Sequence, residues 1–307
     1  MKKNDELIPE FLEFIRRAER VVLNKEHEFK LAWACIAAQG HLLIEDKPGM
    51  GKTSFVRCIA ELLGMPWKRI QCTNDLLPVD ITGGNVLVPS SGEFSFIPGP
   101  IFANVVMADE LNRASPKSQS AFLQAMEEHS ISVDSTTHIL PEPFVVIATQ
   151  NPLDSAGTNP LPESQLDRFM MVLSLGLPGR KAEMQLLTQP SAERQKIHLD
   201  AILTLEAVRN IQKDVQEIFV SPILAEYVLN LVEYLRGKVD SLSTRSVQML
   251  VNAGRAWAHL HSRTFVTIGD IQDVAVPTLS HRIKAANFTS AQSVGVIKEA
   301  IQCTKAP

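Results

Sequence analysis

The sequence lacks the features that place a protein in a membrane or crosslink it by disulfides. Nowhere in its 307 residues do about eighteen apolar residues run together, the length that a membrane-spanning helix requires. Residues 1–6 have no apolar core of the kind found in a secretory signal. We therefore expect no membrane insertion and a cytoplasmic location. Four cysteines follow neither metal-binding nor disulfide-framework spacing, which favours reduced, mostly buried thiols; they are Cys35, Cys58, Cys72 and Cys303.

The sequence also lacks a strong excess of charge of either sign. It has 30 basic and 34 acidic residues, a formal net charge of −4. No basic stripe indicates a phosphate-backbone partner, so nucleic-acid binding is disfavoured. No internal repeat or low-complexity tract is evident. The length is enough for a large core divided into two domains.

What the sequence does contain is a phosphate-binding pattern at residues 41–53. Apolar residues ending at Ile44 predict a buried strand, the next residues a tight glycine-containing turn, and residues 53–63 have the apolar spacing of a helix. This order is that of a P-loop, although Asp46 replaces the usual first glycine. We expect loop N–H groups and the helix N-terminus to hold the phosphates. The predicted nucleotide-binding residues are Asp46, Pro48, Gly49, Met50, Gly51, Lys52, Thr53 and Ser54.

Two carboxylates complete the chemistry that this loop suggests. Residues 105–108 predict a second buried strand, which ends in Asp109 and Glu110. Because unpaired buried charge is very costly, we expect the pair at the carboxyl edge of an α/β sheet, where ligands bind. Asp109 and Thr53 are the predicted Mg²⁺ ligands, Lys52 bridges the β- and γ-phosphates, and Glu110 deprotonates the attacking water. The pattern predicts nucleoside triphosphate hydrolysis.

Four blocks of the chain resemble the AAA+ ATPases and, among them, the MoxR family. They occur in the family's order, at residues 44–53, 99–114, 141–152 and 161–169. MoxR proteins commonly carry Asp at the position of Asp46, so this residue fits the family. The resemblance implies ATP as the nucleotide and an α/β fold, an AAA+ P-loop domain with a doubly wound parallel sheet followed by a small all-helical lid domain.

The resemblance also implies three roles outside these motifs. Asn151, after a third apolar strand, corresponds to sensor 1, an amide that hydrogen-bonds the γ-phosphate or the attacking water. Arg168 resembles the arginine finger, which reaches the neighbouring subunit's nucleotide. Arg113 competes for this role, and a local salt bridge with Asp167 or Glu163 is the alternative for Arg168. Arg245 corresponds to sensor 2, a lid arginine that contacts the phosphates; it lies in a first helical turn, where a cation needs a nearby anion.

The predicted elements also give a domain order. Residues 21–23 connect two amphipathic helices, and in AAA+ proteins this segment packs against the adenine. We expect N-terminal helices over residues 1–34, the core over 35–190 with hairpin inserts at about 84–99 and 130–141, a connecting segment over 191–219 and the lid over 220–307. The hairpins are candidates to contact a client protein or, equally, to pack against a neighbouring subunit.

Together these expectations describe a ring-forming ATPase that assembles as a homo-oligomer, which we expect to be a hexamer. Resemblance to MoxR implies a chaperone-like remodelling, assembly or maturation factor for a client protein or metalloenzyme, often with a von Willebrand A-domain partner. A chelatase-type or nucleic-acid-motor ATPase subunit is the alternative, because those branches share the hairpin inserts. A scaffold that only binds nucleotide is disfavoured by the intact Lys52, Asp109, Glu110 and Asn151.

Overall fold

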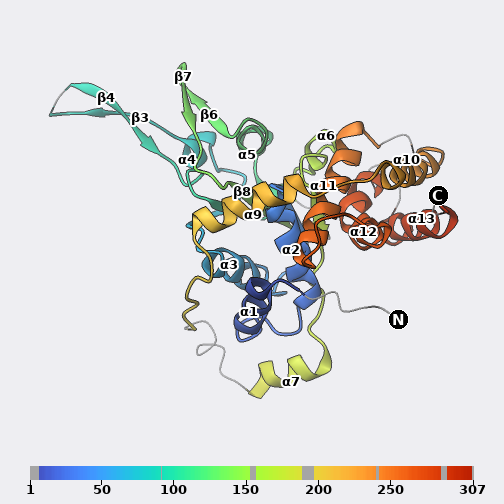
Figure 1. Ribbon diagram of the computed structural model, residues 1–307. Coiled ribbons are helices and arrows are strands. Elements are labelled where there is room, and N and C mark those ends of the chain that lie inside the picture. Colours follow the sequence, from blue (N-terminus) through green and yellow to red (C-terminus); the bar gives the residue numbers. More distant parts are fainter. Residues whose placement is uncertain are drawn as a thin grey trace.

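A five-stranded parallel sheet forms the centre of the protein (Figure 1), in the order β2-β5-β8-β1-β9. The computed structural model describes residues 7–90, 92–152, 157–188, 197–239, 242–284 and 289–305. The sheet strands are β1 (Leu42–Glu45), β2 (Trp67–Gln71), β5 (Val105–Asp109), β8 (Val145–Gln150) and β9 (Met171–Leu173). Every pair of neighbours is parallel, so all five strands end at one edge, here called the carboxyl edge. The opposite one is the amino edge.

Helices cover both faces of this sheet. The core helices are α1 (Pro9–Ala18), α2 (Glu26–Ala37), α3 (Lys52–Leu62), α4 (Pro78–Thr82) and α5 (Pro116–Glu128). Leu42 and Ile44 of β1 pack with α1, α2 and α3, whereas Leu43 packs in a second core with α4 and α5. Successive strand residues point to opposite faces, so strands apolar at every position need cover on both sides. The predicted doubly wound α/β core is confirmed.

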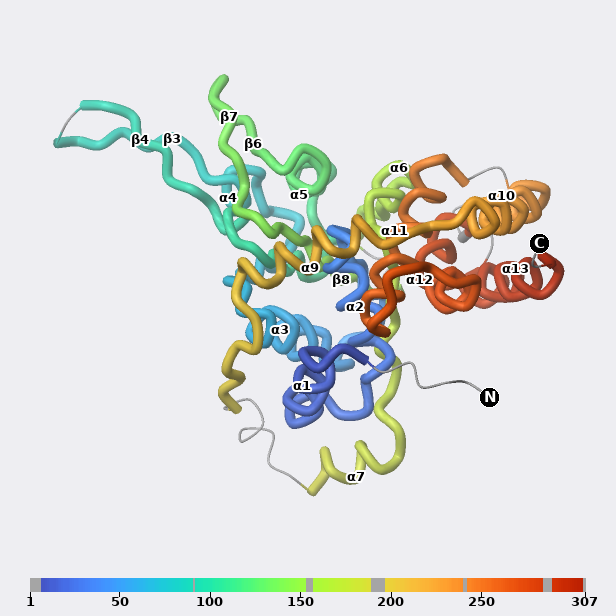
Figure 2. The backbone as a smooth tube through the Cα atoms, in the orientation of Figure 1, coloured from blue at the N-terminus to red at the C-terminus, as the bar shows by residue number. Residues whose placement is uncertain are grey.

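Two β-hairpins project from one side of the core (Figures 1 and 2). They are β3 (Gly83–Val88) with β4 (Glu93–Pro98), and β6 (Ser130–Val133) with β7 (Thr136–Ile139). The Asn85 amide donates to the Asp134 carboxylate at 2.9 Å and links the two. Phe94 and Ile139 are 73% and 72% exposed. The hairpins therefore present apolar surface to whatever lies outside the subunit.

The carboxyl-terminal part is a bundle of helices beside the β9 edge strand (Figure 1). After α7 (Arg180–Thr188) and α9 (Leu205–Glu217), it consists of α10 (Pro222–Arg236), α11 (Thr244–Leu260), α12 (Ile268–Lys284) and α13 (Ser290–Cys303). The side chains of Ser221, Ser243 and Thr289 cap α10, α11 and α13. Helix α11 packs against α2, and α12 against β9. The predicted small helical lid is confirmed.

Helix length and thiol burial are two further features of the fold. Within the described ranges, every helix is too short or too polar to span a bilayer. Cys35, Cys58 and Cys72 are buried and unbridged, and Cys303 is exposed and unbridged. Burial raises the pKa of Cys58 to about 12, so this thiol stays protonated and inert.

Candidate nucleotide-hydrolysis site

The loop between β1 and α3 lies at the carboxyl edge and is open to solvent. Gly49 and Gly51 have φ angles of +82° and +79°, in the left-handed region that glycine adopts without strain. A Cβ atom on either glycine would meet no atom within 4 Å. The outer side of the loop backbone is therefore bare, and a phosphate can approach its N–H groups directly.

Lys52 and Thr53 begin α3 directly behind this loop. No side chain caps the helix at Gly51, so its first N–H groups and positive dipole end are available to an anion. The Lys52 ammonium donates to the main-chain oxygens of Asp46 at 2.5 Å and Lys47 at 3.2 Å. A charged phosphate oxygen is a stronger acceptor than these neutral carbonyls. The lysine is thus held beside the loop by bonds that a nucleotide can replace.

The Asp46 side chain points away from the loop, although the sequence placed this residue among the nucleotide-binding ones. Its carboxylate accepts hydrogen bonds from the Ser174 hydroxyl at 3.0 Å and from the Leu175 N–H, and the residue is buried. Asp46 therefore fastens the start of the loop to the chain that follows β9. Its main-chain oxygen is the part that faces Lys52.

A cavity of about 270 Å³ adjoins the loop. Its lining residues, all from the part of the chain before α9, are Val21, Val22, Leu23, Lys25, Gly49, Met50, Gly51, Ser54, Arg57, Gly176, Leu177, Pro178 and Leu186. Residues 21–23, expected to pack against adenine, form one wall. A larger hollow of about 620 Å³ lies between the sheet, α12 and α13, and its lining includes Glu45 and Lys298 but no residue of the loop. We place the nucleotide in the smaller cavity because the phosphate-binding groups are there.

Asp109 ends β5 and is held by two partners of its own chain. Its carboxylate accepts from the Thr149 hydroxyl at 2.5 Å and from the Arg69 guanidinium, at 2.5 Å to Nη2 and 3.0 Å to Nε. The Asp109 side chain is 10% exposed and that of Arg69 is 46% exposed. A carboxylate this buried needs a positive partner, and Arg69 supplies it.

Glu110, the next residue, has a left-handed backbone with φ of 58°, an uncommon conformation outside glycine that occurs at functional sites. Its N–H donates to the Thr149 hydroxyl at 2.9 Å. Its carboxylate accepts from Gln71 at 3.2 Å and from Arg113 at 3.1 Å. The turn sends the Glu110 side chain beyond the strand end, where a water molecule can reach it. Arg113, in the short helix η1 (Leu111–Arg113), thus pairs with the acid of its own chain.

The donor set at this edge fits Mg²⁺. The predicted ligands, the Thr53 hydroxyl and the Asp109 carboxylate, are hard oxygen donors, and magnesium in nucleotide sites takes few protein ligands beside phosphate and water. Among the described residues no group of three or more His, Cys, Asp or Glu side chains could hold a metal by itself. The cation that Asp109 already recruits, Arg69, shows that this carboxylate requires a positive charge.

Asn151 emerges between the loop and the acidic pair. It follows β8, which lies between β1 and β5, and it is buried. Together with Glu45 and Asn112 it lines a cavity of about 330 Å³. The structure therefore gathers the loop, Asp109, Glu110 and Asn151 at one edge of the sheet.

Arg168 and Arg245 lie at the opposite, amino edge. Both pair with Glu127 near the end of α5, Arg168 at 2.7 Å and Arg245 at 3.1 Å. His41, which precedes β1, identifies this edge. Its main-chain oxygen accepts from the Met170 N–H at 2.9 Å, and its Nε2 contacts the main-chain oxygen of Met126 at 3.1 Å. Burial lowers the pKa of His41 to about 4. The local salt bridge considered for Arg168 exists, but with Glu127 instead of Asp167 or Glu163.

The structure also shows residues that the sequence did not single out. Asp167 accepts from Arg282 at 2.7 Å and from the Ser246 hydroxyl at 3.1 Å, so it ties the Arg168 turn to both α12 and α11. Arg282 is 4% exposed and also donates to the main-chain oxygen of Phe169 at 3.0 Å. Arg69, Gln71, Thr149 and Glu127 contact the predicted residues. Only Arg282 had a signal, because Ala275, Leu279, Arg282 and Ile283 follow the i, i+4, i+7, i+8 spacing of one helix face, which places an arginine on an apolar face.

Comparison with known proteins agrees with this arrangement. Residues 41–171 match the ATPase family associated with various cellular activities (AAA), and residues 239–301 match the AAA lid domain. Chaperone MoxR1 of Mycobacterium tuberculosis is 32% identical over 287 residues, which cover 88% of this chain and 74% of that protein. The uncharacterised protein YeaC of Bacillus subtilis is 39% identical over 100% of this chain and 98% of its own. A crystal structure from Cytophaga hutchinsonii, described as a candidate ATPase, has a TM-score of 0.83 at 31% identity and covers 94% of this chain and 93% of its own.

The sheet order, the phosphate loop, the acidic pair and the helical lid are those of an AAA+ ATPase, the class that these matches define. Within that class, the chain belongs to the MoxR family, since MoxR1 and, at 29% identity over 86% of this chain, Protein MoxR of Paracoccus denitrificans match most of its length. An MCM homologue of Methanopyrus kandleri, with a TM-score of 0.59 at 15% identity, shares the fold alone.

Proposed function

We propose that this protein hydrolyses ATP with Mg²⁺ at the carboxyl edge of its sheet. The observation that carries the proposal is the convergence there of an open phosphate loop, the Asp109–Glu110 pair and Asn151. The loop N–H groups and Lys52 would hold the phosphates, and Thr53 and Asp109 would hold the metal, whose charge would offset that of the phosphates. Glu110 takes a proton from the attacking water, and the Asn151 amide orients that water or the γ-phosphate.

The reaction needs a second copy of the chain. Strands β1 and β8 contain four and six residues, so at about 3.3 Å per residue the two edges lie about 13–20 Å apart. Arg168 and Arg245 at the amino edge cannot reach the phosphates of their own subunit over this distance. They can reach those of a neighbour that docks its carboxyl edge against them. A closed ring, a hexamer in our proposal, repeats this seam at every subunit.

We propose further that the ring works as a chaperone-like remodelling or maturation factor in the cytoplasm. The relative MoxR1 is named a chaperone, and the two hairpins present exposed apolar side chains such as Phe94 and Ile139. An exposed apolar surface suits a protein client. A von Willebrand A-domain partner is part of the proposal, since proteins of this family often work with one.

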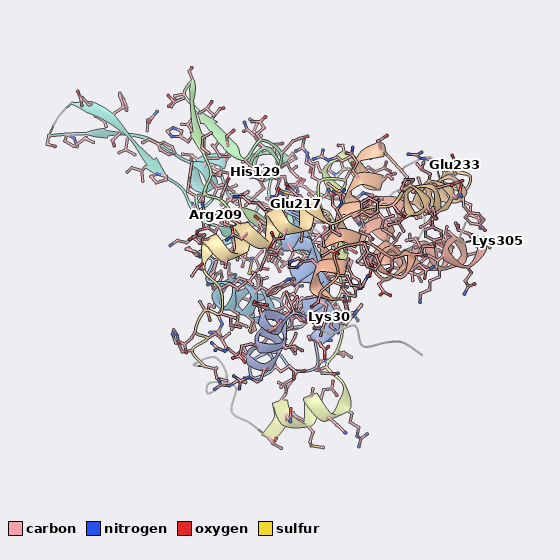
Figure 3. The ribbon with its side chains drawn as sticks, viewed as in Figure 1. Lys30, His129, Arg209, Glu217, Glu233 and Lys305 are labelled. Atoms are coloured by element: carbon pink, nitrogen blue, oxygen red, sulfur yellow. The ribbon has the colours of Figure 1, made fainter. Side chains whose placement is uncertain are left out.

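The decisive experiment is Glu110→Gln. This variant should bind ATP as the wild type does and lose at least about 100-fold in turnover, as removal of a general base does. Glu217→Gln, the same change at an exposed residue of α9 (Figure 3), is the matched control and should be normal. Unchanged turnover in Glu110→Gln at normal ATP affinity would rule out the assigned base.

A further inference from the structure

Two arginines converge on one carboxylate at the amino edge. Arg168 Nη2 lies 2.7 Å from Glu127 Oε2, and Arg245 Nη1 lies 3.1 Å from Glu127 Oε1. Their side chains are 28% and 42% exposed, and that of Glu127 is 43% exposed. The three residues come from α5, the turn after α6 (Glu163–Leu166) and the first turn of α11. Figure 3 labels His129, which directly follows α5 and marks this region.

The backbone that carries Arg168 and Arg245 is held in place, but their guanidinium groups are not. Asp167 binds the buried Arg282 of α12 and the Ser246 hydroxyl of α11. The turn that carries Arg168 is thereby fastened to the helix that carries Arg245. Both guanidinium groups contact Glu127, at a half-exposed position where ion pairs are weak. The side chains can therefore change partners while their helices stay in place.

The charges leave this cluster in need of an anion. Two guanidinium groups share a single carboxylate, so Arg168, Arg245 and Glu127 together keep a charge of +1. Guanidinium forks bind phosphate oxygens in the same geometry as a carboxylate, and a triphosphate carries more negative charge. A nucleotide brought to this surface would outcompete Glu127 for both arginines.

We infer that Glu127 is an internal substitute for the terminal phosphate of the nucleotide bound to a second copy of this chain. In the separate subunit it holds Arg168 and Arg245 together and occupies them. When the neighbour's carboxyl edge docks with its nucleotide, the arginines leave Glu127 for the phosphate. The carboxylate therefore opposes assembly and sets how readily the seam forms. This inference rests on the proposed function, in which the two arginines act on the neighbour's nucleotide.

Glu127→Gln tests this against Glu128→Gln, which removes the same charge one residue later. Glu128 accepts from Gln124 at 2.8 Å, whereas Arg168 and Arg245 both bind Glu127. Both changes are made in the Glu110→Gln background, so ATP is not consumed, and association is followed by sedimentation against protein concentration at fixed ATP. Glu127→Gln should lower the association midpoint about fivefold, because a half-exposed ion pair is worth on the order of 1 kcal/mol. The midpoint should also rise more steeply with salt.

Tighter association of Glu127→Gln separates this role from a structural one, since damage to the fold would weaken association. A midpoint equal to that of Glu128→Gln, or a weaker association than the background, would overturn the inference. Failure of the proposed function looks different: wild type would show no ATP turnover although the Glu110→Gln background still associates and responds to Glu127→Gln.

Discussion

The two edges of the central sheet carry opposite charges, and we propose that both act on a nucleotide bound between two copies of the chain. The carboxyl edge presents Asp109 and Glu110, which require a cation, and the amino edge presents Arg168 and Arg245, which require an anion. Each edge pairs these groups within its own chain: Arg69 binds Asp109, Arg113 binds Glu110, and Glu127 binds both arginines and leaves the amino edge one net positive charge.

The contrast lies in how each edge is built. The carboxyl edge consists of residues that follow strand ends directly, so sheet pairing places them. The amino edge depends on tertiary contacts, because Asp167 must bind Arg282 before the arginines share one surface. In the function that we propose, the core therefore sets the geometry of the first edge, and the second edge connects the site to the lid.

The largest expected effect comes from separating the two edges onto different subunits. Arg168→Ala should lose about 1,000-fold in turnover, as loss of an arginine finger does, with normal ATP binding to the separate subunit. Mixing it with Glu110→Gln subunits should restore activity at seams that pair the healthy halves, about a quarter of all sites in random rings. Turnover of the mixture, compared with that of each variant alone, is the measurement.

Arg113→Ala is the matched control for this mixture. Arg113 pairs with Glu110 of its own chain at the carboxyl edge, so its loss should not be complemented by Glu110→Gln subunits. Recovery with Arg113→Ala and none with Arg168→Ala, in mixtures shown to assemble, would transfer the role to Arg113.

The second prediction breaks the link between the amino edge and the lid. Arg282→Gln removes a buried guanidinium, which is the cation paired with Asp167 and a donor to the main-chain oxygens of Asp167 and Phe169. Removing one partner of a buried ion pair costs about 3 kcal/mol of unfolding free energy, measurable by denaturant titration. ATP affinity of the subunit should stay normal, because the phosphate loop is at the other edge. Lys298→Gln, which also replaces a cation by Gln but at an exposed residue of α13, is the control; equal stability of the two variants would contradict the anchoring role.

The same contrast explains how much the sequence could predict. The loop and the Asp109–Glu110 pair were predictable because each is a short, characteristic run of residues at the end of an apolar strand. The sheet and the lid were predictable from apolar periodicity. Glu127 was not, because a pair of acids at a helix end resembles any solvated surface, and its partner Arg245 lies 118 residues away. Contacts over such separations depend on packing that no local pattern encodes.

The smallest expected effect concerns Arg69, the counterpart of Glu127 at the carboxyl edge. A cation that binds Asp109 must displace the Arg69 guanidinium, so Arg69→Gln should lower the Mg²⁺ concentration needed for half-maximal enhancement of ATP binding. The change should be about fivefold, since a half-exposed ion pair contributes on the order of 1 kcal/mol. Binding of a fluorescent ATP analogue, titrated with Mg²⁺ and repeated in EDTA, measures it without turnover. Lys68→Gln, at the exposed preceding residue of β2, is the control. If both variants need as much Mg²⁺ as the wild type, Arg69 does not compete with the cation. The Arg69–Asp109 pair would then not be the counterpart of the Glu127 pairs at the amino edge.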